Sequence, residues 1–362
     1  MSAEAVRDAL SKVYDPELHR PITDLGMLRR VGVTDGVASV ELVLTIVGCP
    51  AADRIEADVR TAIADVAGVD RLDLTIGVMT PAERDALTAR LRAARPNPFG
   101  ADSLTRVIAV SSGKGGVGKS TVTAGLAVAL AARGLQVGLM DADVFGFSIP
   151  GLLGIPTAKP TQVGELILPP EAHGIRVISI GMFVDDGAAV SWRGPLLHRT
   201  MQQFLTDVYW GDLDVLVIDL PPGTGDVAIS LGQLLPQAEV IVVTTPQPAA
   251  AVVAERSGIV ARQTGQRVIG VIENMSGVVQ SNGTVLELFG SGGGATVSER
   301  LGVPLLGSVP LSMQLRADGD AGSPAVLAHP DDPAAAVLLG IAAALVVRPT
   351  SLAGTSLPLD PR

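Results

Sequence analysis

The stretch "VIAVSSGKGGVGKSTVTAGLAVALAARG", residues 107–134, decides how this chain of 362 residues folds. An apolar run typical of a strand leads into a glycine-rich loop, and a helix that we expect to end near Gly134 follows. The loop, Gly113–Ser120, matches the pattern G-x-x-x-x-G-K-[ST]. Glycines at these positions let backbone N–H groups surround phosphate groups, and the start of the helix adds a favourable dipole. The stretch therefore predicts a phosphate-binding P-loop.

The side chains of this loop suit ATP and Mg²⁺, which are the predicted cofactors. We expect Lys119 to reach the β- and γ-phosphates and the Ser120 hydroxyl to ligate Mg²⁺. The same letters match the dinucleotide pattern G-x-G-x-x-G over residues 113–118, with Asp141 as its ribose-binding acid. The Lys-Ser ending favours the P-loop over this alternative and over a purely structural glycine turn. The nucleotide-binding residues predicted in the loop are Gly113, Lys114, Gly115, Gly116, Val117, Gly118, Lys119, Ser120 and Thr121.

Lys114 is the unusual residue of the loop. An extra lysine two residues after Ser112 has little obvious function toward the nucleotide of its own subunit. It is either a solvated loop side chain or a second charge that acts on the phosphate of a partner subunit. In the second interpretation Lys114 is catalytic, because it stabilises charge that develops during hydrolysis, as an arginine finger does.

Carboxylates follow two further apolar strands. Asp219 ends the strand "DVLVIDL", residues 214–220. Open α/β sheets place ligands at this edge, so we expect Asp219 to hold Mg²⁺ through water; the alternative is a solvated aspartate at a strand end. Asp143, in "LMDADVFG", is either a catalytic residue that orients the attacking water or the cap of a turn.

Beyond the loop, short all-apolar strands alternate with glycine-rich turns and helices. Unbroken apolar strands with helical crossovers indicate an α/β fold, a mainly parallel sheet with helices on both faces. We assign this domain to residues 105–348 and expect a disordered tail over 349–362. The strands that carry the prediction are Val107–Val110, Val137–Met140, Val215–Leu220, Val240–Thr244 and Val268–Ile272.

The first 94 residues differ in style and predict a small α+β domain. Two strands meet at Asp35-Gly36, which is a hairpin signal, and a third is expected at 71–78. Helices are expected over residues 3–13, 51–66 and 81–94. The proline- and glycine-rich segment 95–104 is the predicted linker.

Composition excludes several classes of protein. The net charge of −10 argues against non-specific binding to nucleic acid or to an anionic membrane. A single cysteine excludes an intrachain disulfide and every CxxC metal site, and the four histidines have no ligand spacing. The N-terminus lacks the apolar region of a signal peptide, and the longest apolar stretch, Ala334–Val347, is interrupted by Gly340. We expect a soluble cytoplasmic protein.

The string "KGGVGKST", residues 114–121, resembles the deviant Walker A motif of the MinD/ParA/NifH class, the SIMIBI class of P-loop NTPases. In that class the early lysine contacts nucleotide across an ATP-sandwiched homodimer. Further strings within about residues 105–330 resemble the Mrp/ApbC iron–sulfur cluster carriers. These strings are "DADVFGFSIPGLLG" (141–154), "WRGP" (192–195), "LDVLVIDLPPGTGD" (213–226), "TTPQ" (244–247), "VIENMSG" (271–277), "FGSGGG" (289–294) and "GSVPL" (307–311).

This resemblance implies a homodimeric ATPase that hydrolyses ATP to ADP and phosphate and transfers iron–sulfur clusters to apoproteins, or to assembly factors. It also places Asp143 in the first switch and Asp219 in the second. Asn274 would read the adenine; its alternative is a turn or cap residue after the strand. Neither nucleic acid nor membrane is an expected partner.

The first domain resembles the small MIP18-like domain fused to many of these carriers. The matching strings are "YDPEL" (14–18), "ITDLGML" (22–28) and "LTIVGCP" (44–50). In that family the cysteine of the last string is suspected of handling metal or cluster, so Cys49 is a candidate ligand of a [4Fe-4S] cluster. Its alternative is a buried apolar side chain. A helix N-terminus can lower a thiol's pKa, so the helix expected after Pro50 slightly favours the ligand role over this alternative.

One departure from the carrier pattern limits the cluster chemistry. The family's C-P-x-C pair, which follows the "ENMS" string, is missing, and Gln280 and Gly283 stand where its cysteines are expected. Iron–sulfur clusters need about four ligands, mostly thiolates. A cluster here would need a small thiol, a partner's cysteines, or oxygen or nitrogen ligands. The alternatives are an ATPase scaffold without a cluster and a spatial organiser of the MinD or ParA kind, which the charge and the non-basic tail disfavour.

Overall fold

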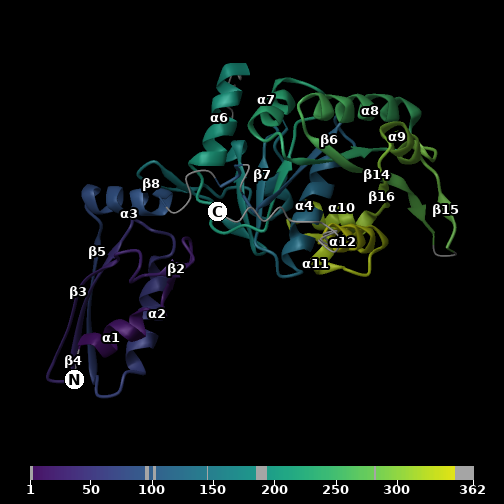
Figure 1. The fold of residues 1–362 in the computed structure, drawn as a ribbon. Coiled ribbons are helices and arrows are strands. Elements are labelled where there is room, and N and C mark those ends of the chain that lie inside the picture. Colours follow the sequence, from purple (N-terminus) through teal and green to yellow (C-terminus); the bar gives the residue numbers. More distant parts are fainter. Residues whose placement is uncertain are drawn as a thin grey trace, which may run out of the picture.

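The computed structural model describes residues 3–93, 98–100, 103–144, 146–184, 194–280 and 283–346. It contains a small N-terminal part and a larger α/β part that lie side by side (Figure 1). The predicted tail 349–362 and most of the predicted linker 95–104 lie outside the described residues. The boundaries proposed from the sequence therefore stay predictions.

A sheet of nine strands forms the centre of the α/β part, in the order β10-β11-β7-β12-β6-β13-β14-β15, with β16 beside β14. Neighbouring strands are parallel except at β10 and β15, which pair antiparallel at the two ends. This confirms the predicted fold class. The strands are β6 (Arg106–Ser112), β7 (Val137–Asp141), β10 (Glu171–Ala172), β11 (Ile175–Ser179), β12 (Val215–Asp219), β13 (Glu239–Thr244), β14 (Arg267–Val279), β15 (Val285–Leu286) and β16 (Leu305–Leu311).

Helices cover both faces of this sheet, as predicted (Figure 1). One face carries α4 (Lys119–Ala131), α10 (Met313–Asp320), α11 (Ala325–Ala328) and α12 (Pro333–Val346). The other carries α7 (Asp226–Leu234), α8 (Pro248–Gln263) and α9 (Gly293–Leu301). Strands β7, β11 and β12 are buried along their whole length, which explains why they are apolar without alternation. No helix in the described part of the chain is both long and apolar enough to cross a membrane.

The short elements between β7 and β12 complete the α/β part. They are α5 (Ile149–Leu152), β8 (Thr161–Val163), β9 (Leu166–Leu168), the 3-10 helix η1 (Ile180–Phe183) and α6 (Gly194–Thr206). The sequence did not predict β11 or β16, and β14 extends past the predicted strand 268–272 because it runs on into the hairpin with β15. Strand β12 ends at Asp219, one residue before the predicted end.

The N-terminal part is an α+β unit built on a three-stranded sheet in the order β3-β4-β5. Asp35 and Gly36 both have positive φ, 47° and 76°, so the predicted turn joins β3 to β4. Helix α1 ends at Leu10, earlier than the predicted residue 13. The elements are α1 (Ala3–Leu10), β1 (Tyr14–Asp15), β2 (Arg20–Pro21), β3 (Leu28–Thr34), β4 (Val37–Leu44), α2 (Ala52–Ala64), β5 (Arg71–Val78) and α3 (Pro81–Ala93).

The hairpin β8–β9 of the α/β part packs into the core of the N-terminal part. Val163, Leu166 and Leu168 are buried in the same cluster as Leu87 and Leu91 of α3. Figure 1 shows β8 against α3, between the two parts. The two parts therefore share one hydrophobic core at their junction, which the sequence did not indicate.

Candidate nucleotide-binding site

The loop between β6 and α4 has the backbone geometry of a phosphate-binding loop. Gly116 and Gly118 have positive φ, 78° and 75°, which any other residue adopts only under strain. A Cβ atom on Gly113 would lie 2.1 Å from the backbone of Val253 in α8. The glycines thus fit a tight turn pressed against its neighbours, as the motif predicts.

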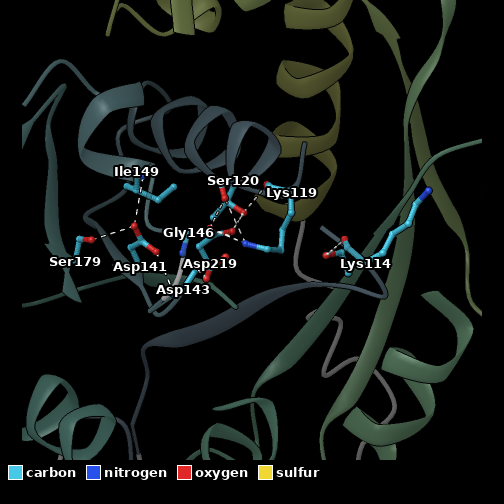
Figure 2. A network of polar contacts seen from close by, with 11 residues as sticks. Lys114, Lys119, Ser120, Asp141, Asp143, Gly146, Ile149, Ser179 and Asp219 are labelled. Carbon is cyan, nitrogen blue, oxygen red and sulfur yellow. Dashed lines mark hydrogen bonds and ion pairs between the residues drawn. The ribbon is translucent and has the colours of Figure 1, made fainter. Parts of the chain in front are cut away.

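A buried carboxylate, Asp219, holds the start of α4. Lys119 Nζ and Ser120 Oγ lie 2.7 Å and 2.6 Å from Asp219 Oδ2. Thr123 Oγ1 lies 2.7 Å from Asp219 Oδ1, one turn further along α4. Figure 2 shows how Lys119, Ser120 and Asp219 converge. The structure therefore brings together the lysine, the hydroxyl and the carboxylate named from the sequence, although their roles stay predictions.

The donor set at this point suits a magnesium ion. A hydroxyl and a carboxylate are hard oxygen ligands of the kind that Mg²⁺ prefers; the hydroxyl comes from the end of the phosphate loop and the carboxylate from the end of the neighbouring strand β12. Asp219 ends β12 and is fully buried, so its position is fixed by the sheet rather than by a flexible loop. The residues present therefore fit the predicted ion.

Asp141 and Asp143 have different surroundings. Asp141 is fully buried, accepts a hydrogen bond from Ser179 Oγ at 3.0 Å, and has its pKa raised to about 7 by burial and by the charge of Asp219. Asp143 accepts a hydrogen bond from the Gly146 backbone at 3.0 Å, which is the turn-capping contact. Asp143 also lines the phosphate cavity, so the water-orienting role stays a prediction.

Two cavities meet at the loop. The phosphate cavity, about 760 Å³, is lined by the loop, Asp143 and the residues that follow β12. A second cavity of about 850 Å³ lies beyond Gly118 and Thr121 and includes Asn274 and the end of β16. Asn274 is buried, and its Nδ2 donates to the Val117 carbonyl at 2.8 Å. It therefore lies beside the phosphate loop on the wall of the second cavity, and its contact with adenine stays a prediction.

Lys114 lies at the same loop but points away from the carboxylates. Its side chain is exposed, and its Nζ donates to Gln247 Oε1 at 3.1 Å at the start of α8. Figure 2 shows the side chain extending to the opposite side of the loop from Asp219. Lys114 nevertheless lines the phosphate cavity, so its action on a partner subunit stays a prediction.

Cys49 lies in the N-terminal part, far along the molecule from this loop. Its side chain is 5% exposed, and its Sγ donates to Glu17 Oε2 at 3.7 Å. Burial raises the pKa of the Cys49 thiol to about 11, and the nearby carboxylates of Glu17 and Asp15 act in the same direction. The helix that follows Pro50 therefore does not outweigh burial in setting the pKa of this thiol.

The structure gives no thiol substitute at the missing C-P-x-C position. Gln280 and Gly283 belong to the turn between β14 and β15, where the Gln280 N–H donates to the Thr284 carbonyl at 2.8 Å. Among the described residues, no group of three or more His, Cys, Asp or Glu side chains is arranged to hold a metal ion.

Three functional contacts escaped the sequence analysis. They are Thr123 on Asp219, Ser179 on Asp141, and Thr161 on Glu17. Thr123 had a detectable signal, because it lies one helical turn after Lys119 on the side that faces β12. Ser179 and Thr161 had none, because each contact spans elements that are distant in sequence.

Comparisons with known proteins agree with this geometry. The profile of the family described as NUBPL iron-transfer P-loop NTPase matches residues 103–346, and that of an iron–sulfur cluster assembly protein matches residues 3–74. An iron–sulfur cluster carrier protein of Mycobacterium tuberculosis is 54% identical over 99% of this chain and 96% of its own length. One of Escherichia coli is 37% identical over 91% and 89%.

Solved structures resemble the α/β part. A nucleotide-binding protein from Archaeoglobus fulgidus, in complex with ADP, has a TM-score of 0.53 at 38% identity, covering 60% of this chain and 86% of that one. The cell division ATPase MinD of Pyrococcus furiosus has a TM-score of 0.50 at 23% identity, covering 66% and 98%, and supports the fold alone.

Proposed function

The chain belongs to the NUBPL iron-transfer P-loop NTPase family, and from this premise we propose that it is an iron–sulfur cluster carrier driven by ATP. It binds MgATP at the loop Gly113–Ser120, hydrolyses it to ADP and phosphate, and delivers clusters to apoproteins. The observation that carries the ATPase half of this proposal is the convergence of Lys119 and Ser120 on buried Asp219.

Each residue of the site has an assigned task. Lys119 leaves Asp219 to bind the β- and γ-phosphates, and Ser120 and Asp219 hold Mg²⁺, which neutralises phosphate charge when bound. Asp143, at the wall of the phosphate cavity, orients the attacking water. Asn274 contacts the adenine from the entrance of the second cavity.

The protein works as a homodimer closed by nucleotide. This proposal rests on Lys114, which is exposed and directed away from its own Asp219. An exposed lysine beside the phosphate cavity is available to a facing copy of the chain, where it stabilises the charge that develops on the transferred phosphate.

The cluster is the cargo rather than a resident cofactor. A homodimer has two copies of Cys49 and no other cysteine, which is fewer than the roughly four ligands a cluster takes. Cys49 therefore supplies at most one ligand per chain, and the acceptor protein or a small thiol supplies the others.

Anaerobic reconstitution with iron and sulfide, with and without a small thiol, tests this function by visible absorbance. We expect a cluster chromophore in the wild type that Cys49→Ser removes, while the variant still binds ATP. Absence of a chromophore in the wild type under both conditions would favour a scaffold that binds ATP without handling clusters. In parallel, Lys119→Ala is expected to lose phosphate binding itself.

A further inference from the structure

The carboxylate of Glu17 connects the two parts of the molecule at Cys49. Its Oε2 accepts from Cys49 Sγ at 3.7 Å, and its Oε1 accepts from Thr161 Oγ1 at 2.9 Å. Glu17 and Cys49 belong to the N-terminal part, whereas Thr161 begins β8 of the α/β part. One side chain therefore holds the thiol from one side and the α/β part from the other.

The loop that carries Glu17 is held by the α/β part at two further consecutive residues. The Tyr209 hydroxyl donates to the Leu18 carbonyl at 3.3 Å, and His19 Nε2 lies 2.6 Å from Glu171 Oε1. Within the loop, buried Asp15 accepts from the backbone N–H groups of Glu17 and Leu18 at 2.8 Å and 2.9 Å. The position of Glu17 therefore depends on both parts.

A cavity of about 930 Å³ lies between the two parts on the outer side of Glu17. Glu17, Pro50 and Thr161 line it, together with residues of α2 and of the segment around β9 and β10. Among the described residues, Glu17 and Pro50 line this cavity, whereas Cys49 does not. Glu17 thus separates the thiol from a space large enough for a small ligand or the cysteine loop of another protein.

The supports of this loop are connected to the phosphate cavity. Leu197 of α6 lines that cavity, and the segment that follows α6 contains Tyr209. This segment is hydrogen bonded to β9, because the Ile167 N–H donates to the Asp207 carbonyl at 2.9 Å and the Tyr209 N–H to the Ile167 carbonyl at 2.8 Å. A displacement of α6 by nucleotide would therefore reach both Tyr209 and the β8–β9 hairpin that carries Thr161.

We propose that Thr161 and Glu17 form a latch that covers Cys49 in the nucleotide-free protein and opens toward the interdomain cavity when ATP binds. Glu17 acts as a positioning residue for the thiol, and Thr161 couples it to the ATPase. The latch rests on ATP binding, which is part of the proposed function, but it does not depend on which cargo then meets Cys49.

The single cysteine makes the latch directly measurable, because alkylation of the whole protein by N-ethylmaleimide reports Cys49 alone. Alkylation of a buried thiol needs local opening of the structure. We expect slow alkylation without nucleotide and an increase of about fivefold or more with MgATP, the lower end of ordinary couplings between sites. Equal rates with and without MgATP, in a sample shown to bind ATP, overturn the latch.

Two matched variants separate the latch from a general loosening of the interface. Thr161→Val removes the hydroxyl that donates to Glu17. Thr88→Val is the control: it removes a hydroxyl of α3 that donates to the Val163 carbonyl of the same hairpin, at 3.3 Å, and leaves Glu17 untouched. Thr161→Val should alkylate fast without nucleotide and gain little from MgATP, and Thr88→Val should behave as the wild type. An unchanged Thr161→Val, or equal acceleration in both variants, contradicts the latch.

This experiment needs no cluster, so it fails separately from the proposed function. If MgATP accelerates alkylation in a protein that forms no cluster chromophore, the latch is supported and cluster carriage is contradicted. If a chromophore forms that depends on Cys49 but MgATP does not change the alkylation rate, cluster carriage is supported and the latch is contradicted.

Discussion

Asp219 is the residue on which the phosphate site depends, because three side chains of α4 share its two oxygens. A buried carboxylate keeps its charge only where such partners surround it. Lys119 and Ser120 are expected to exchange this partner for nucleotide and metal. Thr123 is not expected to contact the nucleotide. Its hydrogen bond to Asp219 should therefore persist when nucleotide binds and keep this carboxylate oriented.

Replacing Thr123 by Val should therefore weaken the fold and the site together. The variant keeps the shape of the side chain and loses a hydrogen bond to a charged group, worth about 1.5–3 kcal/mol. Denaturant unfolding of the nucleotide-free protein measures this loss. Thr61→Val is the matched control, since Thr61 donates only to the exposed Ala57 carbonyl within α2. Equal stability of the two variants would contradict the role given to Thr123.

Asp141 predicts an unusual pH dependence. Its pKa of about 7 lies above the unfolded value near 3.8, so the folded state binds more protons between these values and stability falls as pH rises from about 4 to 7. Asp141→Asn carries no such titration. Between pH 5 and 8 the unfolding free energy of the variant should rise relative to the wild type by about 2–3 kcal/mol. Parallel pH profiles would show that Asp141 is ionised throughout.

At the residue scale, the sequence predicted the loop and its partner carboxylate because a contiguous motif and a strand end determine both. It could not predict the environment of Cys49. The sequence left Cys49 open between a cluster ligand and a buried apolar side chain, and Glu17 and the surrounding apolar residues bury it. That environment comes from a loop more than thirty residues away in the sequence, and a local sequence pattern does not predict such a contact.

Among the elements, the loop and the start of α8 define the side of the site that faces away from Ser120 and Asp219, the predicted magnesium ligands. Lys114 donates to Gln247 there and is exposed to a second molecule. The sequence anticipated this element well, since the glycines fix its backbone. It anticipated β14 less well, because the polar residues "ENMS" interrupt the apolar pattern although the strand continues to Val279.

Lys114→Ala should abolish most hydrolysis while ATP binding is largely kept. A charge supplied to a phosphoryl transfer by a partner is worth about 10³-fold or more in rate, and the Lys114 ammonium lies on Gln247 rather than beside Asp219. ATP turnover and nucleotide affinity, measured on the same samples, test this. Lys114→Arg keeps the charge and should retain part of the activity. Full turnover in Lys114→Ala would remove the lysine from catalysis.

Over the whole molecule, the N-terminal part and the α/β part share one hydrophobic core at their junction, since the β8–β9 hairpin packs into the core of the former. The sequence suggested two separate domains joined by a linker. Each strand of the hairpin has only three residues, which is too short for a periodic signal, and its partner in α3 is about eighty residues away. Tertiary packing alone specifies this junction.

Leu166→Ala should therefore destabilise the N-terminal part although it lies in the other one. Removing a buried leucine costs about 2–5 kcal/mol, and Leu166 is 3% exposed among N-terminal residues. Denaturant unfolding and the rate of Cys49 alkylation report the loss. Leu104→Ala is the control, because Leu104 is 88% exposed and should change stability little. Identical behaviour of the two variants would mean that the parts are independent.

Transfer of a reconstituted cluster to an iron–sulfur apoprotein, followed anaerobically with MgATP, with MgADP and without nucleotide, tests most directly that ATP gates delivery. Faster transfer with MgATP, lost in Lys119→Ala and in Cys49→Ser, is the predicted result. Equal transfer rates under all three conditions would contradict nucleotide-gated cluster carriage.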